Sequence, residues 1–140
     1  MEKIYSIKEP GKLLHILFSS KDMPSHGDSL KRVEFTPPET NLQAMACSAP
    51  KGHIVKPHHH NTVERITNIT HESVLVTSGV IELTIYDIDN ALLKTCILHA
   101  GDCAMIVEGG HRLKVLEEAT FFELKNGPYL GQVKDTTHID

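Results

Sequence analysis

The chain has 140 residues, of which 40% are hydrophobic and 23% are charged, a composition typical of a globular domain rather than of a disordered or fibrous chain. Its formal net charge of -4 and its lack of a dense Lys/Arg cluster argue against nucleic acid and anionic membranes as partners, since phosphate binding depends on clustered cations. No apolar run approaches the ~20 residues that span a bilayer, no secretory segment opens the chain, and three cysteines without C-x-x-C spacing favour a reducing, cytoplasmic location.

Short apolar or alternating runs follow one another along the chain, and turn residues separate most of them. The runs that we expect to form strands are Leu13–Phe18, Leu42–Ser48, Ser73–Thr77, Val80–Asp87, Ala91–His99, Cys103–Val107, His111–Glu117 and Thr120–Lys125. No window shows the sustained apolar stripe of an amphipathic helix. Many short strands with regular turn punctuation predict an all-β fold, either a sandwich or a barrel.

One loop and one hairpin can be placed more closely within this pattern. The segment Lys21–Pro38 carries three prolines and a polar tract, so we expect a loop or arm there. Ile81, Leu83 and Ile85 alternate with more polar residues, and the turn residues Asp87–Asn90 follow them. This pattern predicts a hairpin with one apolar face.

Histidine is the unusual residue type here, because the chain has ten and four of them lie between residues 53 and 60. Pro57 disfavours a helix at the residue before it, so an extended backbone is expected. In an extended chain, residues two apart point the same way. His58 and His60 therefore project to one side, His59 projects to the other, and the pair suggests the beginning of a metal site; a solvated histidine-rich loop is the alternative.

Two further candidate ligands begin rows of apolar residues. Glu72 shares its strand face with Val74 and Val76, and His111 shares its face with the apolar residues two and four positions on. A charged group on a core face is costly without a partner. A metal would supply that partner, but so would Arg65 or another cation for Glu72, or a backbone carbonyl for His111.

These residues together resemble two short motifs of the cupin family. The segment Gly52-x5-His58-x-His60 with Glu72-x6-Gly79 resembles the first motif, and Gly101 through Gly109-Gly110-His111 resembles the second. The resemblance covers residues 45–125, and it implies a small double-stranded β-helix, or jelly-roll barrel, with an N-terminal strand arm. It also implies a divalent metal held by His58, His60, Glu72 and His111 near the barrel mouth.

The sequence departs from the family pattern at several places. The first motif usually has three or four residues between the second histidine and the carboxylate, which would select Glu64, but His71 then stands where a glycine is usual. We prefer Glu72 as the carboxylate and leave Glu64 as the alternative. Val107 occupies the usual proline position of the second motif, and the usual downstream asparagine is absent.

The chemistry that the resemblance implies depends on the open positions of the metal. Three imidazoles and one carboxylate leave two octahedral positions free, which suits Fe, Mn, Ni or Co, whereas Zn can sit with fewer ligands. Such a centre supports a dioxygenase, isomerase, epimerase or lyase acting on a small oxygenated metabolite. The alternatives are a metal-independent sugar-nucleotide isomerase or epimerase, with His60 and His111 as acid/base groups, and a non-catalytic small-molecule-binding cupin.

We expect one cupin domain over residues 1–140, with a core at 45–125, an N-terminal arm at 1–40 and a C-terminal extension at 126–140. Candidate substrate contacts are Glu64, Arg65 and His59, and the alternative for the first two is an ion pair with each other at the surface. His71 is expected at the surface, facing away from Glu72. We also expect a homodimer with Ile4–Phe18 as the interface or swapped segment, because open strand edges are a liability.

Overall fold

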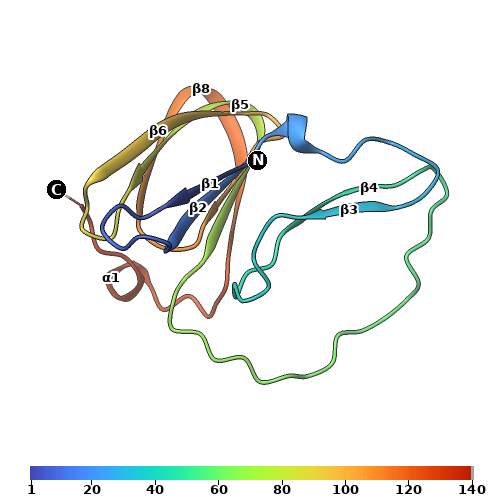
Figure 1. The fold of residues 1–140 in the computed structure, drawn as a ribbon, viewed down its shortest axis with the longest axis horizontal. Coiled ribbons are helices and arrows are strands. Elements are labelled where there is room, and N and C mark those ends of the chain that lie inside the picture. Colours follow the sequence, from blue (N-terminus) through green and yellow to red (C-terminus); the bar gives the residue numbers. More distant parts are fainter. Residues whose placement is uncertain (140) are drawn as a thin grey trace.

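The computed structural model describes residues 1–139, and it is built from antiparallel strands with very little helix, so the predicted all-β class is confirmed (Figure 1). The strands are β1 (Glu2–Tyr5), β2 (Leu13–Phe18), β3 (Lys31–Glu34), β4 (Met45–Ser48), β5 (Glu72–Tyr86), β6 (Leu92–His99), β7 (Cys103–Ile106) and β8 (Gly110–Lys125). A 3-10 turn spans Ser20–Asp22, and the one-turn helix α1 spans Gln132–Asp135. Six strands form one sheet in the order β1-β2-β7-β5-β6 with β8 also on β5, and β3 pairs with β4.

The long strand β5 is the central strand of the larger sheet, because it pairs with β6, β7 and β8. β8 pairs with it from one end to the other, whereas β7 and β6 share its second edge, β7 beside the first half and β6 beside the last half. The register shifts between Val76 and Ile81, where the ribbon bends. Gly79 at this bend has φ 76°, and a side chain there would collide with the backbone of Glu118. The predicted strands Ser73–Thr77 and Val80–Asp87 are therefore the two halves of one bent strand, β5. In the same way, the predicted strands His111–Glu117 and Thr120–Lys125 are the two halves of β8.

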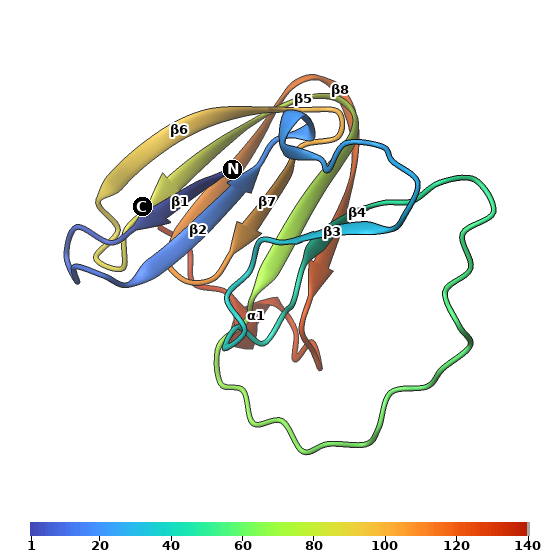
Figure 2. The ribbon, with the colours of Figure 1, turned by 45° about the vertical axis from the view of Figure 1, so that its right-hand side comes forward.

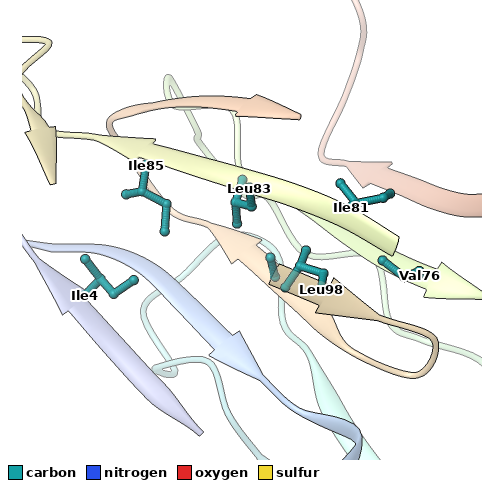
Figure 3. Packing of buried hydrophobic residues seen from close by; sticks show 7 residues of the cluster. Ile4, Val76, Ile81, Leu83, Ile85 and Leu98 are labelled. Carbon is teal, nitrogen blue, oxygen red and sulfur yellow. The ribbon is translucent and has the colours of Figure 1, made fainter. Parts of the chain in front are cut away.

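The inner core lies between the two folded halves of the sheet. Figure 3 shows Val76, Ile81, Leu83 and Ile85 of β5 packed with residues of β1 and β6. All four side chains are almost fully buried, and burial of each contributes about 1.5–3 kcal/mol of hydrophobic stabilisation. The alternating apolar face predicted for the β5–β6 hairpin is therefore confirmed, and it forms the centre of the fold.

Side chains join the two end strands of the sheet, β1 and β6. The Lys94 ammonium lies 2.6 Å from a Glu2 carboxylate oxygen. In the turns that follow β1 and β5, the buried Asp87 carboxylate accepts hydrogen bonds from the Ser6 hydroxyl at 2.5 Å and from the Ile7 amide at 2.7 Å. Side-chain contacts therefore connect the two ends of the sheet.

The β3–β4 hairpin covers the outer face of β2 and β7. Phe35, just after β3, stacks on Phe18 of β2 with ring centroids 4.6 Å apart, and Met105 of β7 lies in the same cluster. The sequence pattern predicted only a loop over Lys21–Pro38, yet β3 lies inside it. The four residues of β3 show no apolar alternation, so no local pattern indicated a strand there. The strand forms through its pairing with Met45–Ser48.

Residues 51–70 form neither helix nor strand, and every side chain in this segment is exposed. Figure 2 shows the segment as a wide excursion from the end of β4 to the start of β5, away from both sheets. The three consecutive histidines lie in it. In the part of the chain that the structure describes, no helix has the length and apolar character needed to cross a membrane.

Candidate functional site

A cavity of about 590 Å³ lies where β5 begins, β7 ends and the two ends of β8 approach each other. The strands contribute Glu72, Ile106, His111, Arg112 and Lys125 to its lining, and parts of the 126–139 segment, including Tyr129, complete it. Binding sites for small molecules are typically cavities of about 300–1,000 Å³ with a few converging polar groups. This cavity has both properties, so we treat it as the candidate site.

Glu72 provides the carboxylate at the wall of the cavity. Its side chain is 9% exposed, and its Oε2 lies 3.0 Å from Lys125 Nζ and 3.8 Å from His111 Nε2. Burial alone lowers the pKa of Lys125, but the Glu72 carboxylate outweighs burial, so the pKa of Lys125 is raised. The buried carboxylate is therefore compensated by an ammonium group from the neighbouring strand.

The bend in the β5–β8 ribbon explains how residues from opposite ends of the ribbon meet. Glu72 pairs with Lys125 at one end of the ladder, whereas Ile85 pairs with His111 at the other end. Folding about Gly79 stacks the two ends, and Glu72 and His111 then face each other across the interior. The structure thus brings together two of the four residues proposed as metal ligands.

The other two proposed ligands, His58 and His60, lie in the exposed 51–70 segment. Their rings approach each other with centroids 5.4 Å apart, as expected for residues that project to one side. The Nδ1 atom of His58 lies 2.8 Å from the Lys56 carbonyl oxygen. His59, Glu64 and Arg65 are exposed in the same segment, outside the cavity.

The donor types of the proposed metal centre suit a divalent cation, but the structure places them as two pairs. Over residues 1–139, no three His, Cys, Asp or Glu side chains lie close enough together to hold a metal ion. As arranged, the His58–His60 pair and the Glu72–His111 pair therefore do not form one coordination sphere. The four-ligand centre stays a prediction.

His15 is a feature of this region that the sequence patterns did not reveal. It lies on β2 opposite Ile106, which also pairs with Glu72 on the other side, so the three residues form one row across the sheet. The ring is fully buried, and neither nitrogen has a hydrogen-bond partner among the described residues. Burial, with a smaller effect from His111, lowers the pKa of His15 to about 3, so the ring is neutral. In the sequence, the only indication of a buried histidine was that His15 lies within the apolar run Leu13–Phe18.

His71 is buried, although the sequence predicted it at the surface. Its Nδ1 accepts hydrogen bonds from the amides of Asn41 at 3.1 Å and Leu42 at 3.4 Å, and its own amide donates to Asn126 Oδ1 at 2.6 Å. Burial lowers its pKa. The residue connects the loop after β3 to the start of β5 and to the end of β8, which positions Glu72 and Lys125 beside the cavity.

Charged groups of both signs line the cavity: Lys125 and Arg112 are its cations, and Glu72 and Asp135 are its carboxylates. Lys125 contacts Glu72, and Arg112 Nη2 lies 3.3 Å from a Glu82 carboxylate oxygen and 3.2 Å from Thr84 Oγ1 at the rim. The Arg112 side chain is 59% exposed, so part of the guanidinium is accessible to a ligand. Together with the imidazole of His111, these groups favour a ligand rich in oxygen atoms, such as a carboxylate or a phosphate.

Comparison of the chain with family models, with curated proteins and with solved structures gives no match in any of the three. The proposal that follows therefore depends on the geometry of the cavity and on the motif resemblance described above.

Proposed function

We propose that the chain is a small cupin-type jelly-roll protein whose cavity binds a small oxygenated metabolite and exchanges protons with it. The observation that carries this proposal is the buried Glu72 carboxylate, held between Lys125 and His111 at the wall of the cavity. The bent antiparallel strands, folded into two facing halves, support the jelly-roll assignment. The order of the two motif-like segments along the chain supports the family assignment.

His111 is the group proposed to move the proton. Imidazole exchanges protons near neutral pH more readily than other side chains, which is why it is the commonest general acid or base. The Glu72 carboxylate, 3.8 Å from His111 Nε2, stabilises the imidazolium that forms when the ring accepts a proton. Glu72 and His111 therefore act as a unit, with His111 facing the substrate.

The reaction class that fits this unit is proton transfer next to a carbonyl group. His111 takes a proton from the carbon, the electron pair moves onto the carbonyl oxygen, and the resulting enolate oxygen is stabilised by the positive charge of Lys125 or Arg112. Where the deprotonated carbon carries a hydroxyl, transfer of the hydroxyl proton to the enolate oxygen and return of the carbon-bound proton to the former carbonyl carbon give an isomer. Return of the proton to the opposite face of the original carbon gives an epimer. Loss of a leaving group from the enolate instead gives a lyase reaction.

A ligand screen with and without chelator tests the proposal. We expect hydroxy acids or sugar phosphates to raise the melting temperature of the wild-type protein, and turnover to incorporate solvent deuterium into the substrate. His111→Gln and Glu72→Gln should lose both effects, whereas His59→Gln in the exposed segment should keep them. Equal binding by all variants, or no binding across the panel, contradicts the proposal; binding without deuterium incorporation indicates a non-catalytic binding protein.

A metal-dependent form of the site is the second candidate, because the chain offers two pairs of suitable donors, His58 with His60 and Glu72 with His111. These four residues are the proposed ligands for Fe, Mn, Ni, Co or Zn. Elemental analysis of protein purified without a histidine tag tests this. Stoichiometric metal that is lost on the change of His58 and His60 to Ala, but kept in His59→Ala, supports it. Metal content that these changes leave unaltered contradicts it.

A further inference from the structure

β8 presents the long open edge of this fold. Over its 16 residues, β8 pairs on one side with β5, and no strand from residues 1–139 pairs with its other side. The two end strands β1 and β6, by contrast, contact each other through Glu2 and Lys94. An open edge presents unpaired N–H and C=O groups, which are a template for another strand.

Apolar side chains are exposed along this edge. Val115, Leu116, Phe122 and Leu124 all have large exposed fractions. Val115 is 53% exposed, yet its partner across the ladder is the fully buried Ile81. The face that carries the core is therefore incompletely covered where it reaches β8, and a further strand beside Val115 would cover it.

The charges of β8 indicate what that strand is. Arg112 and Lys125 are paired within the chain, but Lys114, Glu117 and Glu118 are exposed and have no ion-pair partner in the described part of the chain. The unpaired basic residue precedes the two unpaired acidic residues. When two copies of one strand pair antiparallel, the start of each lies against the end of the other, so a lysine of one copy meets the acidic residues of the second.

We propose that the β8 edge is the docking surface for a second copy of this chain, paired antiparallel through residues 114–118. The two-fold symmetric contact places each Lys114 opposite Glu118 of the other copy, covers Val115 and Leu116, and satisfies the backbone groups of both edges. This surface differs from the N-terminal segment expected from the sequence, because β2 already pairs with β1 and β7 within the chain. It lies on the same strand as His111, so dimer formation also restrains one wall of the cavity.

Charge reversal with sedimentation velocity tests the proposal. The variants are Lys114→Glu, the double change Glu117→Lys with Glu118→Lys, and the triple change that combines them. The first two place like charges opposite each other in both halves of the symmetric contact, and each should raise the dimer dissociation constant roughly tenfold. The triple variant restores opposite charges and should return the constant close to the wild-type value. Lys3→Glu, an exposed change on β1, is the control and should leave it unaltered.

Three results overturn the proposal. The first is a wild-type protein that stays monomeric over the whole concentration range. The second is a dimer that responds to Lys3→Glu and not to the β8 changes, which places the interface at the N-terminal strands. The third is protection from hydrogen exchange, in the monomer, of those amides of residues 114–118 that point away from β5, which means that the chain's own segment covers the edge. Circular dichroism of each variant verifies that it is folded.

Discussion

Two regions of this molecule carry functional candidates, and they differ in what surrounds them. Glu72 and His111 lie on strands whose neighbours fix the register, whereas His58 and His60 lie in a segment without strand partners. In both regions, side chains two residues apart point the same way. This alternation predicts which way a side chain points along its own strand, but only pairing with other strands determines which side chains from distant parts of the chain meet.

Truncation of a core residue is expected to give the largest loss of stability. Leu83→Ala should lower the free energy of unfolding by about 2–5 kcal/mol, because it leaves a cavity between the two halves of the bent sheet. The matched change Ile66→Ala, in the exposed segment, should alter it by about 0.5 kcal/mol or less. Chemical denaturation measures both. Similar losses for the two variants would show that the 51–70 segment packs against the protein.

His15 tests what a buried ring without hydrogen-bond partners costs in stability. His15→Leu should raise the free energy of unfolding by about 1–3 kcal/mol at neutral pH, because it removes a buried polar ring without hydrogen-bond partners. The folded-state pKa of His15 is about 3, below the ordinary 6.5, so the histidine increasingly opposes folding as the pH falls below 6.5. The advantage of the leucine variant should therefore grow toward pH 4.

Denaturation curves of wild type and His15→Leu across pH 4 to 8 measure this effect. His53→Leu, a change of an exposed histidine, is the control and should show no such growth. A destabilised His15→Leu protein would mean that the ring makes a favourable polar contact.

Asp87 gives an acid-dependent contribution to stability through its contacts with residues 6–8. Hydrogen bonds from Ser6 and from the Ile88, Lys8 and Ile7 amides overcome the opposing effect of burial and lower the pKa of Asp87 to about 2. Because the folded-state pKa lies below the ordinary 3.8, this stabilisation is complete above pH 4 and is lost as the pH falls through 2. In Asp87→Asn, the free energy of unfolding should fall less between pH 4 and pH 2 than it does in the wild type. The exposed control Asp89→Asn should show the same fall as the wild type.

The smallest expected effect belongs to the histidine triplet. Replacement of His58 and His60 by Ala should change the free energy of unfolding by about 0.5 kcal/mol or less in metal-free protein, because both rings are exposed. Thermal unfolding in the presence of chelator measures it. A larger loss would indicate that the two rings pack against the protein, which would bring the two regions closer together than the structure places them.

Sequence patterns predicted the parts of the fold where local alternation and global burial agree. The hairpin from Ile81 to Leu92 and the inward direction of Glu72 are of this kind, and both follow from a period of two. The bend at Gly79 was predicted as a turn between two strands, because sequence alone does not show that the ladder continues through a bulge.

Other features had no local signal. β3 is defined by its pairing with β4, and His71 is buried because backbone amides of Asn41 and Leu42 reach its ring. The His15 ring lies inside an apolar run, where its neighbours gave no indication of a polar site. Each of these depends on contacts between residues far apart in the chain, which spacing along the sequence does not encode.

The contact between Glu72 and His111 can be tested directly with histidine-ring NMR spectra of Glu72→Gln and Glu64→Gln. Removal of the Glu72 charge should shift the ring resonances of His111 and leave those of His58 and His60 in place, whereas Glu64→Gln should leave His111 unaltered. A His111 ring that does not respond to Glu72→Gln, or that responds to Glu64→Gln instead, would contradict the site described here.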